Sequence, residues 1–308
     1  MRPYYKLFFG LLVGAVFALV LFILLRGASF SVLFPVGSVG LAERDLMVHA
    51  TLLMLIVIVP VYILAIFISW HYRAGNTSAT YKPNWEHSKM EELIWWSIPF
   101  EIVLVLSALT WTSTHELDPA KNLAASGTPL TVQVVALPWK WLFIYPDQSI
   151  ATVNELDLPT NRPVEFQITS DAPMNSFWIP ALGGQIYAMT GMTTKLHLIA
   201  SEVGTYEGAS ANYSGDGFAQ MKFVAKTLTE KDFEAWVGKT QQVPKTLDGS
   251  AFAELAKPGD AGPVRYYGIV SKNLFQNIVN TFMMSASSSG MQMQVETGSS
   301  GTQMQMEQ

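Results

Sequence analysis

Three long apolar stretches limit most strongly what this chain can fold into. They cover residues 7–25, 46–70 and 93–111. Each approaches the roughly 20 apolar residues that an α-helix needs to cross the hydrocarbon core of a membrane. The whole chain agrees, because 50% of its residues are hydrophobic and only 14% are charged, a more apolar balance than that of ordinary soluble domains. The sequence therefore predicts a membrane protein with helical spans.

The first stretch follows a short basic start that contains Arg2 and Lys6, which is the pattern of a secretory signal peptide or a signal anchor. We assign residues 1–28 to this segment. The second and third stretches predict a transmembrane domain of two helices over residues 41–114.

The charges around these two helices predict their orientation. The loop between them carries Arg73, Lys82 and Lys89, whereas the chain after them continues as Glu116-Leu117-Asp118. Because basic loops stay in the cytoplasm, both outer ends of the helical pair are expected to face away from it. In a bacterium this makes the chain a multi-pass protein of the inner membrane with its C-terminal part in the periplasm.

One carboxylate lies inside the third apolar stretch. Glu101 follows Pro99 by two residues, at a depth where ionisable side chains usually face protein or water and serve a function. The alternative is a protonated side chain that is hydrogen-bonded to a partner helix. Both interpretations stay open.

The pattern changes after residue 128, where short runs alternate between apolar and polar residues. The runs 131–136, 163–169, 195–200 and 219–224 predict strands, and Gly, Pro, Asn and Asp clusters separate them at intervals suited to an antiparallel sandwich. We assign residues 128–226 to this all-β domain. Short helices are expected in residues 227–284, at 229–239, 250–256 and 271–284, and the tail 285–308 is rich in Met, Gln and Ser and is expected to be disordered.

Composition excludes several functions. The net charge of -5 argues against a nucleic-acid partner. The chain has no cysteine, so it can form neither thiolate metal sites nor iron–sulfur clusters. The segment 204–218 is rich in Gly and small polar residues and is expected to be a loop, but it contains no Cys, His or Met. It has the character of a metal-binding loop from which the ligands are missing.

Four ordered motifs resemble those of one family, subunit II of the haem–copper terminal oxidases. The resemblance covers the chain from about Gly40 to Phe223. The motifs are Glu92-Leu93-Ile94-Trp95-Trp96-Ser97-Ile98-Pro99, Trp139-Lys140-Trp141-Leu142-Phe143-Ile144-Tyr145-Pro146, Asn175-Ser176-Phe177-Trp178-Ile179-Pro180-Ala181-Leu182-Gly183 and the loop 204–218. The resemblance implies a membrane α-helical hairpin followed by a periplasmic, all-β, cupredoxin-like Greek-key sandwich with short C-terminal helices.

The family has a branch with a dinuclear copper centre and a branch without one. In the copper branch the ligands are two His, two Cys, a Met and a Glu backbone carbonyl. The resemblance places these ligands, in the order His, Cys, Glu, Cys, His and Met, at Asn175, Ala209, Ala211, Tyr213, Gly217 and Gln220. None of the side-chain ligands is present, so no metal is expected at these positions.

The loop resembles the copper-free branch, the quinol oxidases of cytochrome bo type, which carry Tyr-x-Gly-x-Ser-Ala-x-Tyr-Ser-Gly at this place. The resemblance implies subunit 2 of a proton-pumping quinol:oxygen oxidoreductase of an aerobic respiratory chain, with no cofactor on this chain and with haems and copper in subunit I. The implied partners are subunit I, other oxidase subunits, membrane lipid, and quinol through subunit I, but not cytochrome c. Two alternatives remain, a membrane-anchored cupredoxin-like interaction module and a degenerate cytochrome c oxidase subunit II.

The resemblance also indicates a proton-uptake residue. Glu92 matches the Glu that lies near the entrance of a proton channel into subunit I, at the cytoplasmic start of the second helix. A carboxylate at that place is also favoured by the helix dipole alone. Glu101, nine residues further on, is expected to face away from Glu92.

Four aromatic residues alternate in the second motif. Trp139, Trp141, Phe143 and Tyr145 resemble the aromatic strand of the family. In the copper branch an aromatic residue here passes electrons, but without copper that role has no acceptor. We therefore expect these side chains to pack in the core and at an interface.

One departure from the quinol branch concerns the first stretch. Members often carry a lipoprotein Cys after a Leu-x-Gly context, and here Leu25-Arg26-Gly27 is followed by Ala28. The segment is then either cleaved near residues 27–29 or retained as a third spanning helix.

Overall fold

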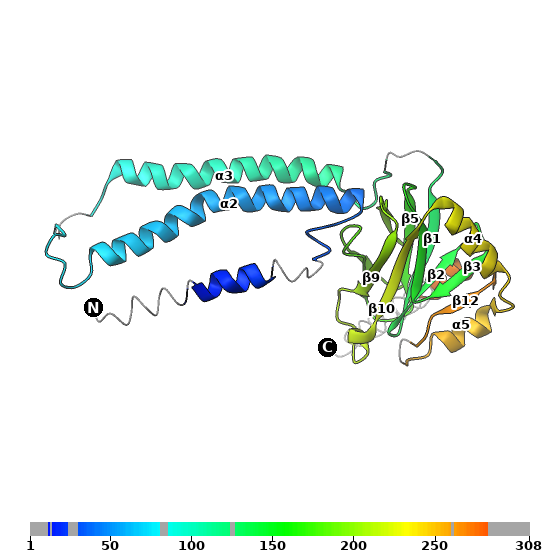
Figure 1. Ribbon diagram of the computed structural model, residues 1–308. Coiled ribbons are helices and arrows are strands. Elements are labelled where there is room, and N and C mark those ends of the chain that lie inside the picture. The colour runs from blue at the N-terminus through cyan, green and yellow to red at the C-terminus, as the bar shows by residue number, and fades with distance from the viewer. Residues whose placement is uncertain are drawn as a thin grey trace, which may run out of the picture.

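The computed structural model describes residue 12 and residues 14–23, 30–80, 86–123, 127–259 and 262–282. Two long helices, α2 (Ser38–His71) and α3 (Lys89–Glu116), lie side by side and project from a β-sandwich (Figure 1). Lys82, Ala28 and the tail 285–308 lie outside the described residues.

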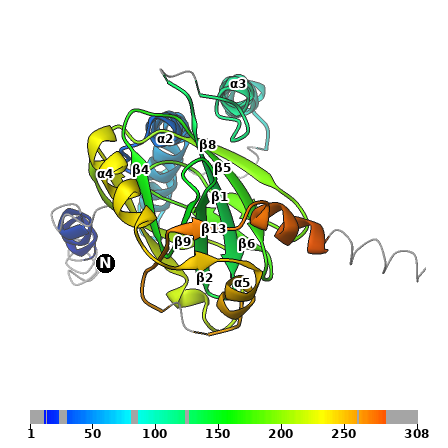
Figure 2. The same cartoon turned by 90° about the vertical axis from the view of Figure 1, so that its right-hand side faces the viewer.

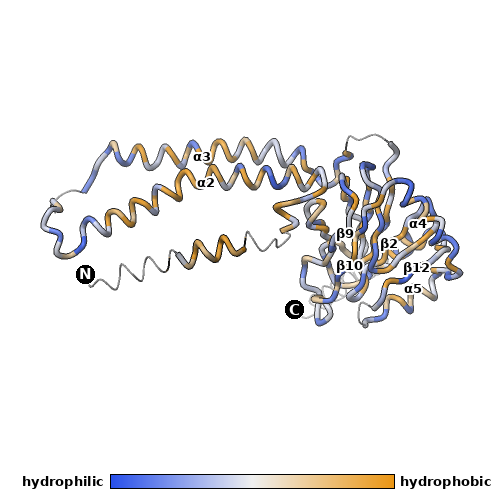
Figure 3. The backbone as a smooth tube through the Cα atoms, in the orientation of Figure 1, coloured by the Kyte–Doolittle hydropathy of each residue, from blue (hydrophilic) through white to orange (hydrophobic). Residues whose placement is uncertain are grey.

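Both helices carry apolar side chains along most of their length (Figure 3). Each is long enough and apolar enough to cross a membrane, as the sequence predicts. α2 starts eight residues earlier than the apolar stretch that begins at Leu46, because its first turns pack on the sandwich instead of entering the apolar zone. Of the first stretch, a shorter apolar helix is described over Gly14–Ile23, and most of the remaining residues of 1–28 lie outside the described part.

The sandwich is built from two sheets, as expected. The six-stranded sheet has the order β12-β3-β2-β1-β5-β8, and the five-stranded sheet has the order β4-β10-β9-β6-β7. The strands are β1 (Leu130–Leu137), β2 (Lys140–Tyr145), β3 (Ile150–Val153), β4 (Glu155–Pro159), β5 (Val164–Ser170), β6 (Asn175–Trp178), β7 (Ile186–Ala188), β8 (Thr194–Leu198), β9 (Gly204–Ser210), β10 (Lys222–Leu228) and β12 (Arg265–Tyr267).

The expectation of a purely antiparallel sandwich is corrected by two pairs of strands. β1 pairs with β5 in parallel, and β10 pairs with β4 in parallel. In both cases the chain passes through several other strands before it returns, which gives it the length that a parallel crossover needs.

The prediction of a loop at 204–218 is also corrected, because the first half of this segment is the strand β9. β9 pairs with β10 along one edge and with β6 along the other. A side chain added at Gly208 would collide with the ring of Phe223. In the sequence this glycine indicates a loop, but in the structure it leaves room for a buried aromatic ring. A short 3-10 helix, η1 (Phe218–Gln220), takes the place of the first residues of the strand predicted at 219–224.

A single aromatic cluster fills the space between the sheets. Trp141, Phe143, Phe166, Phe177 and Phe223 are fully or almost fully buried there. The rings of Phe177 and Phe223 stack with their centroids 5.3 Å apart. Phe177 belongs to β6, and the ring of Phe223 lies against Gly208 of β9. These two strands carry two of the six copper-ligand positions, Asn175 and Ala209.

A second apolar core lies on the outer face of the six-stranded sheet, under the C-terminal part of the chain. Figure 2 views the sandwich from the side opposite to α2 and α3, with β13 and α5 in front. The segment forms α4 (Glu230–Gln241), β11 (Thr246–Leu247), α5 (Gly249–Leu255), β13 (Ile269–Val270) and a helix described over residues 274–282. The three predicted short helices are therefore present, and the side chain of Thr229 caps α4 by accepting from Asp232 N.

Candidate functional site

Asn175, at the first predicted His position, is a buried and hydrogen-bonded residue. It starts β6 and has no exposed surface. Its Oδ1 accepts from Ser210 Oγ at 3.0 Å, and its Nδ2 donates to the carbonyl of Pro173 at 2.7 Å. Because both ends of the amide are satisfied within the protein, Asn175 stabilises the local fold and has no free group directed at a metal.

Four further positions lie on β9, in the loop after it and on η1. Ala209 pairs with Trp178 and Lys222 in the sheet. Ala211 N donates to Ser176 O at 3.0 Å, so the loop passes beside Asn175. Ala211 and Tyr213 are exposed, and the ring of Tyr213 contacts Phe218 with 5.6 Å between centroids. Gln220 is exposed on η1. The two alanines offer no ligand atom on their side chains, and none of the four side chains is a thiolate, imidazole or thioether.

Trp139 fills the space that a ligand at position 217 would need. A Cβ atom on Gly217 would lie 2.2 Å from Cδ2 of Trp139, which is far inside van der Waals contact. Trp139 precedes β2 in the left-handed backbone region with φ 59, so it lies in a turn and not in the strand. The turn directs its indole onto the loop that carries Gly217.

These positions do not fit a copper ion. Among the described residues, no group of three or more His, Cys, Asp or Glu side chains is arranged to hold a metal. A dinuclear copper site needs thiolates, and the chain has no cysteine. Fold and site together define a membrane-anchored cupredoxin-like domain that cannot bind copper in the family's manner.

The other aromatic residues of the second motif lie in the interior. Trp141, Phe143 and Tyr145 are completely buried. Trp141 contacts Phe177 edge to face with 5.4 Å between centroids, and Tyr145 contacts Trp236 of α4 in the same way at 5.2 Å. The strand thus joins the sandwich to α4.

Glu92 lies in the first turn of α3, at the end of the helix furthest from the sandwich (Figure 1). Its Oε1 lies 3.4 Å from His87 Nδ1, and both side chains are well exposed. The side chain of the N-cap residue Ser88 makes no capping hydrogen bond, and the positive end of the helix dipole favours a negative charge here.

Glu101 lies in the same helix and is exposed on its surface. Nine residues separate it from Glu92, which turns the two side chains to opposite sides of α3. The structure does not bring the two carboxylates together.

Sequence reasoning missed a buried cluster of ionisable groups on β4. Glu155 and Asp157 point to the same side of this strand and are both buried. Glu155 accepts from Tyr266 Oη at 2.5 Å and pairs with Lys226 Nζ at 2.6 Å. The signal was present in the sequence as two carboxylates that alternate with Leu156 and Leu158.

The cluster changes the acidity of its members. Burial, and then the charge of Glu155, raise the pKa of Asp157 to about 7. Burial and the neighbouring Asp157 also raise the pKa of Tyr145 well above its usual range. The hydroxyl of Tyr145 donates to the carbonyl of Asp157 at 3.0 Å, so the aromatic strand and the acidic strand are joined at this point.

Comparison with known proteins agrees with this architecture. The family model of the "cytochrome c oxidase subunit II, periplasmic domain" matches residues 146–228, and that of the "COX aromatic rich motif" matches residues 241–286. The periplasmic domain of cytochrome oxidase subunit II of Bradyrhizobium japonicum superposes with a TM-score of 0.36 at 23% identity, over 38% of this chain and 96% of that one.

Two relatives extend the similarity to most of the chain. Cytochrome bo(3) ubiquinol oxidase subunit 2 of Pseudomonas putida is 51% identical over 260 residues, which are 84% of this chain and 83% of the relative. Ubiquinol oxidase subunit 2 of Acetobacter aceti is 47% identical over 279 residues, 89% of this chain and 91% of the relative. The chain belongs to the ubiquinol oxidase subunit 2 family, within subunit II of the haem–copper oxidases.

Proposed function

We propose that this chain is subunit 2 of a quinol:oxygen oxidoreductase that pumps protons in an aerobic respiratory chain. The observation that carries the proposal is a cupredoxin-like domain whose copper-ligand positions are occupied by a hydrogen-bonded Asn175 and by Gly217 beneath an indole, in a chain that matches ubiquinol oxidase subunits 2 over most of its length.

The chemistry of the electron donor explains why subunit 2 needs no copper centre. A water-soluble electron carrier needs a relay outside the membrane, whereas quinol is lipid-soluble and reaches a membrane subunit directly. Subunit I then oxidises quinol, and it holds the haems and the copper at which oxygen is reduced. This chain carries out no catalysis alone and does not receive cytochrome c.

The surface of α2 and α3 supports an association with other membrane subunits. The two helices contact each other along one face, and large apolar side chains such as Leu52, Ile56 and Leu104 remain exposed. Exposed apolar surface of this extent is stable only against lipid or partner helices. We infer that subunit I covers part of it, that lipid covers the rest, and that the sandwich lies over the periplasmic face of subunit I.

Glu92 is the proposed proton-uptake residue of this subunit. It is exposed at the end of the helical pair that the positive-inside rule places in the cytoplasm, and His87 lies within 3.4 Å of it. A carboxylate there can take protons from water and deliver them toward the partner subunit.

The test uses the purified complex and a matched pair of variants. The wild-type complex should consume oxygen with a short-chain quinol and not with reduced cytochrome c. We expect Glu92→Gln to lower kcat by about two- to tenfold with an unchanged KM for quinol. Glu91→Gln, in the same helical turn but rotated by about 100°, should leave kcat unchanged.

Two results would contradict the proposals separately. If this chain purifies from native membranes without haem-containing partners, the assignment as an oxidase subunit is wrong. If both glutamate variants behave like the wild type, the assignment stands and the role of Glu92 is wrong.

A further inference from the structure

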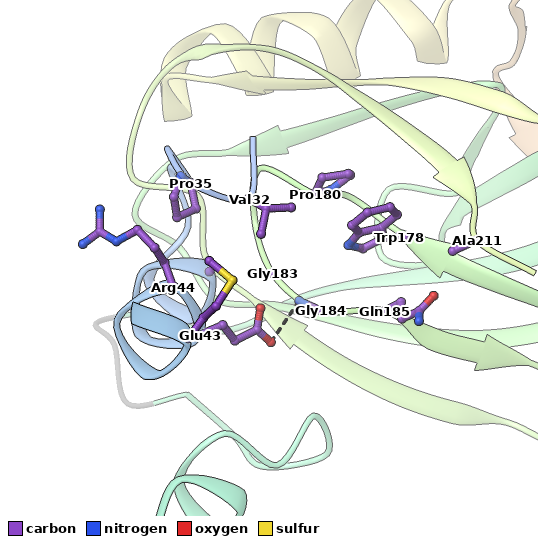
Figure 4. Close-up of a pocket in the computed structure, with 12 residues that line it drawn as sticks. Val32, Pro35, Glu43, Arg44, Trp178, Pro180, Gly183, Gly184, Gln185 and Ala211 are labelled. Carbon is purple, nitrogen blue, oxygen red and sulfur yellow. Dashed lines mark hydrogen bonds between the residues drawn. The ribbon is translucent and has the colours of Figure 1, made fainter. Parts of the chain in front are cut away.

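A cavity lies where α2 leaves the sandwich, and Ala211 is the one copper-ligand position among the residues that line it. Its volume is about 350 Å³, large enough for a small polar head group with a glycerol but not for a whole lipid. Figure 4 shows its walls, which come from the start of α2 and from the chain between β6 and β7. Its apolar lining includes Val32, Pro35, Met47, Trp178 and Pro180.

The backbone around this cavity is held firmly. Val36 N donates to Ala181 O at 2.7 Å, and Gly40 N donates to Leu182 O at 3.0 Å. A Cβ atom on Gly37 would lie 2.2 Å from Leu182 O, so only a glycine allows this approach. The start of α2 and the segment after β6 therefore form one preformed wall.

Two charged residues line the cavity, Glu43 and Arg44. Glu43 is half-buried, and its Oε1 accepts from Gly184 N at 3.1 Å. Arg44 is paired with Asp45 at 2.6 Å, and its guanidinium points away from the cavity (Figure 4). Within the described part of the chain, no second partner is recorded for the carboxylate of Glu43. A cationic group with N–H donors would complete its coordination.

The cavity also adjoins the membrane. Glu43 lies one helical turn before Met47, and Met54, Ile58 and Val61 continue the exposed apolar surface on the same side of α2. A ligand with a cationic head in the cavity could therefore extend its apolar part along α2 into the hydrocarbon zone. A water-soluble amine would leave that apolar surface uncovered.

We propose that this cavity binds a phospholipid with a primary ammonium head group, with Glu43 as its counter-ion and the indole of Trp178 against the glycerol region. The site favours zwitterionic lipids with N–H donors over anionic ones, because the one cation among its lining residues, Arg44, is paired with Asp45 and points away from the cavity. This inference goes beyond the proposed function and does not depend on quinol oxidation.

The test is photolabelling of the purified complex in nanodiscs. Each disc contains a trace of a lipid with a diazirine close to the glycerol, carried either by phosphatidylethanolamine or by phosphatidylglycerol. Labelled peptides are identified by mass spectrometry. We expect the ethanolamine lipid to label the peptides that contain Met47 or Trp178 about tenfold more than the glycerol lipid, the ratio expected for one charge-assisted hydrogen bond.

The matched variants are Glu43→Gln and Glu202→Gln. The first keeps the shape of the side chain and its bond to Gly184 but removes the charge, so labelling by the ethanolamine lipid should fall about tenfold. Glu202 is exposed on the sandwich between β8 and β9 and does not line this cavity, and its substitution should change nothing. The comparison of the two lipids on the wild type needs no variant and remains decisive if Glu43→Gln is unstable.

Two outcomes would overturn the proposal. One is equal labelling by the two lipids at these peptides. The other is coupling of Glu43 to a lysine of a partner subunit by a zero-length carbodiimide reagent, because a protein ammonium would then occupy the cavity.

Discussion

The packing around Gly217 explains why substituting copper ligands at the six ligand positions would not create a copper site. Gly217 supports the indole of Trp139, with no room for a Cβ atom between them. A His at this position would displace the indole, and the turn before β2 with it. The space of the former site is now part of the packing of the sandwich.

This packing gives the first prediction. We expect Gly217→Ala to lower the free energy of unfolding by about 1–3 kcal/mol, as overpacking does. The measurement is chemical denaturation of the full-length protein, followed by tryptophan fluorescence. Gly238→Ala is the control, because it lies in α4 with open space around its Cα and should be neutral or stabilising by up to about 1 kcal/mol. Equal effects of the two substitutions would show that Trp139 does not depend on Gly217.

Asp157 gives a prediction about pH. Its pKa rises from 3.8 to about 7 on folding, so the folded protein binds more protons than the unfolded chain between these values. The contribution of Asp157 to stability is complete below pH 4 and is lost as the pH rises toward 7, with a slope of at most about 1.4 kcal/mol per pH unit. In Asp157→Asn this part of the pH dependence should disappear. Denaturation at pH 5, 6, 7 and 8 measures it, and an unchanged profile in the variant would contradict the assignment.

At the scale of elements, β2 shows how the C-terminal part of the chain completes the domain. All six residues of β2 are buried, because one face contacts the aromatic core and the other faces α5 and the helix 274–282. A strand of an isolated two-sheet sandwich would expose alternate residues. Burial of this second face by the C-terminal elements therefore contributes to the stability of the domain.

Lys140 holds one of these elements in place. Its Nζ donates to the carbonyls of Leu255 and Lys257, each at 3.0 Å, at the C-terminal end of α5. Burial, and then Arg265, lower the pKa of this amine. The lysine thus satisfies helix carbonyls that have no partner within the helix.

We expect Lys140→Met to destabilise the protein by about 1–3 kcal/mol, because two buried carbonyls lose their donor while the volume is kept. Faster cleavage near α5 in limited proteolysis should accompany the loss. Lys239→Met, at an exposed position in the last turn of α4, should change neither quantity. Unchanged cleavage in Lys140→Met would mean that apolar contacts alone hold α5.

Elements with strong local signals were predictable from the sequence. The apolar lengths of α2 and α3 and the cap residue Thr229 of α4 are examples. β9 was not predictable, because Gly208 in its middle is explained only by the ring of Phe223 on a neighbouring strand. The same holds for the site: its ligand positions follow from the resemblance, but the indole over Gly217 and the contact between Glu155 and Tyr266 join residues far apart in the sequence.

At the scale of the whole molecule, backbone hydrogen bonds join the helical pair to the sandwich at both helices. Gly37 and Gly40 hold α2, and on the α3 side His197 N donates to Pro119 O at 3.0 Å. With 34 residues, α2 is about 50 Å long, longer than the roughly 30 Å of a hydrocarbon core. The first turns of α2 must then stand outside the hydrocarbon, beside the sandwich.

A helix of this length can cross the membrane, so the loop after α2 and the sandwich are predicted to lie on opposite sides of it. If the loop between α2 and α3 lies in the cytoplasm, a thiol at Ser78 should be inaccessible from outside, whereas one at Ser250 in α5 should be accessible. The native chain has no cysteine, so Ser78→Cys and Ser250→Cys each introduce a single reporter. A membrane-impermeant maleimide should label Ser250→Cys in intact spheroplasts and Ser78→Cys only after lysis. Labelling of Ser78→Cys in intact spheroplasts would show that the helical pair does not cross the membrane, because both helices would then have their two ends on the same side.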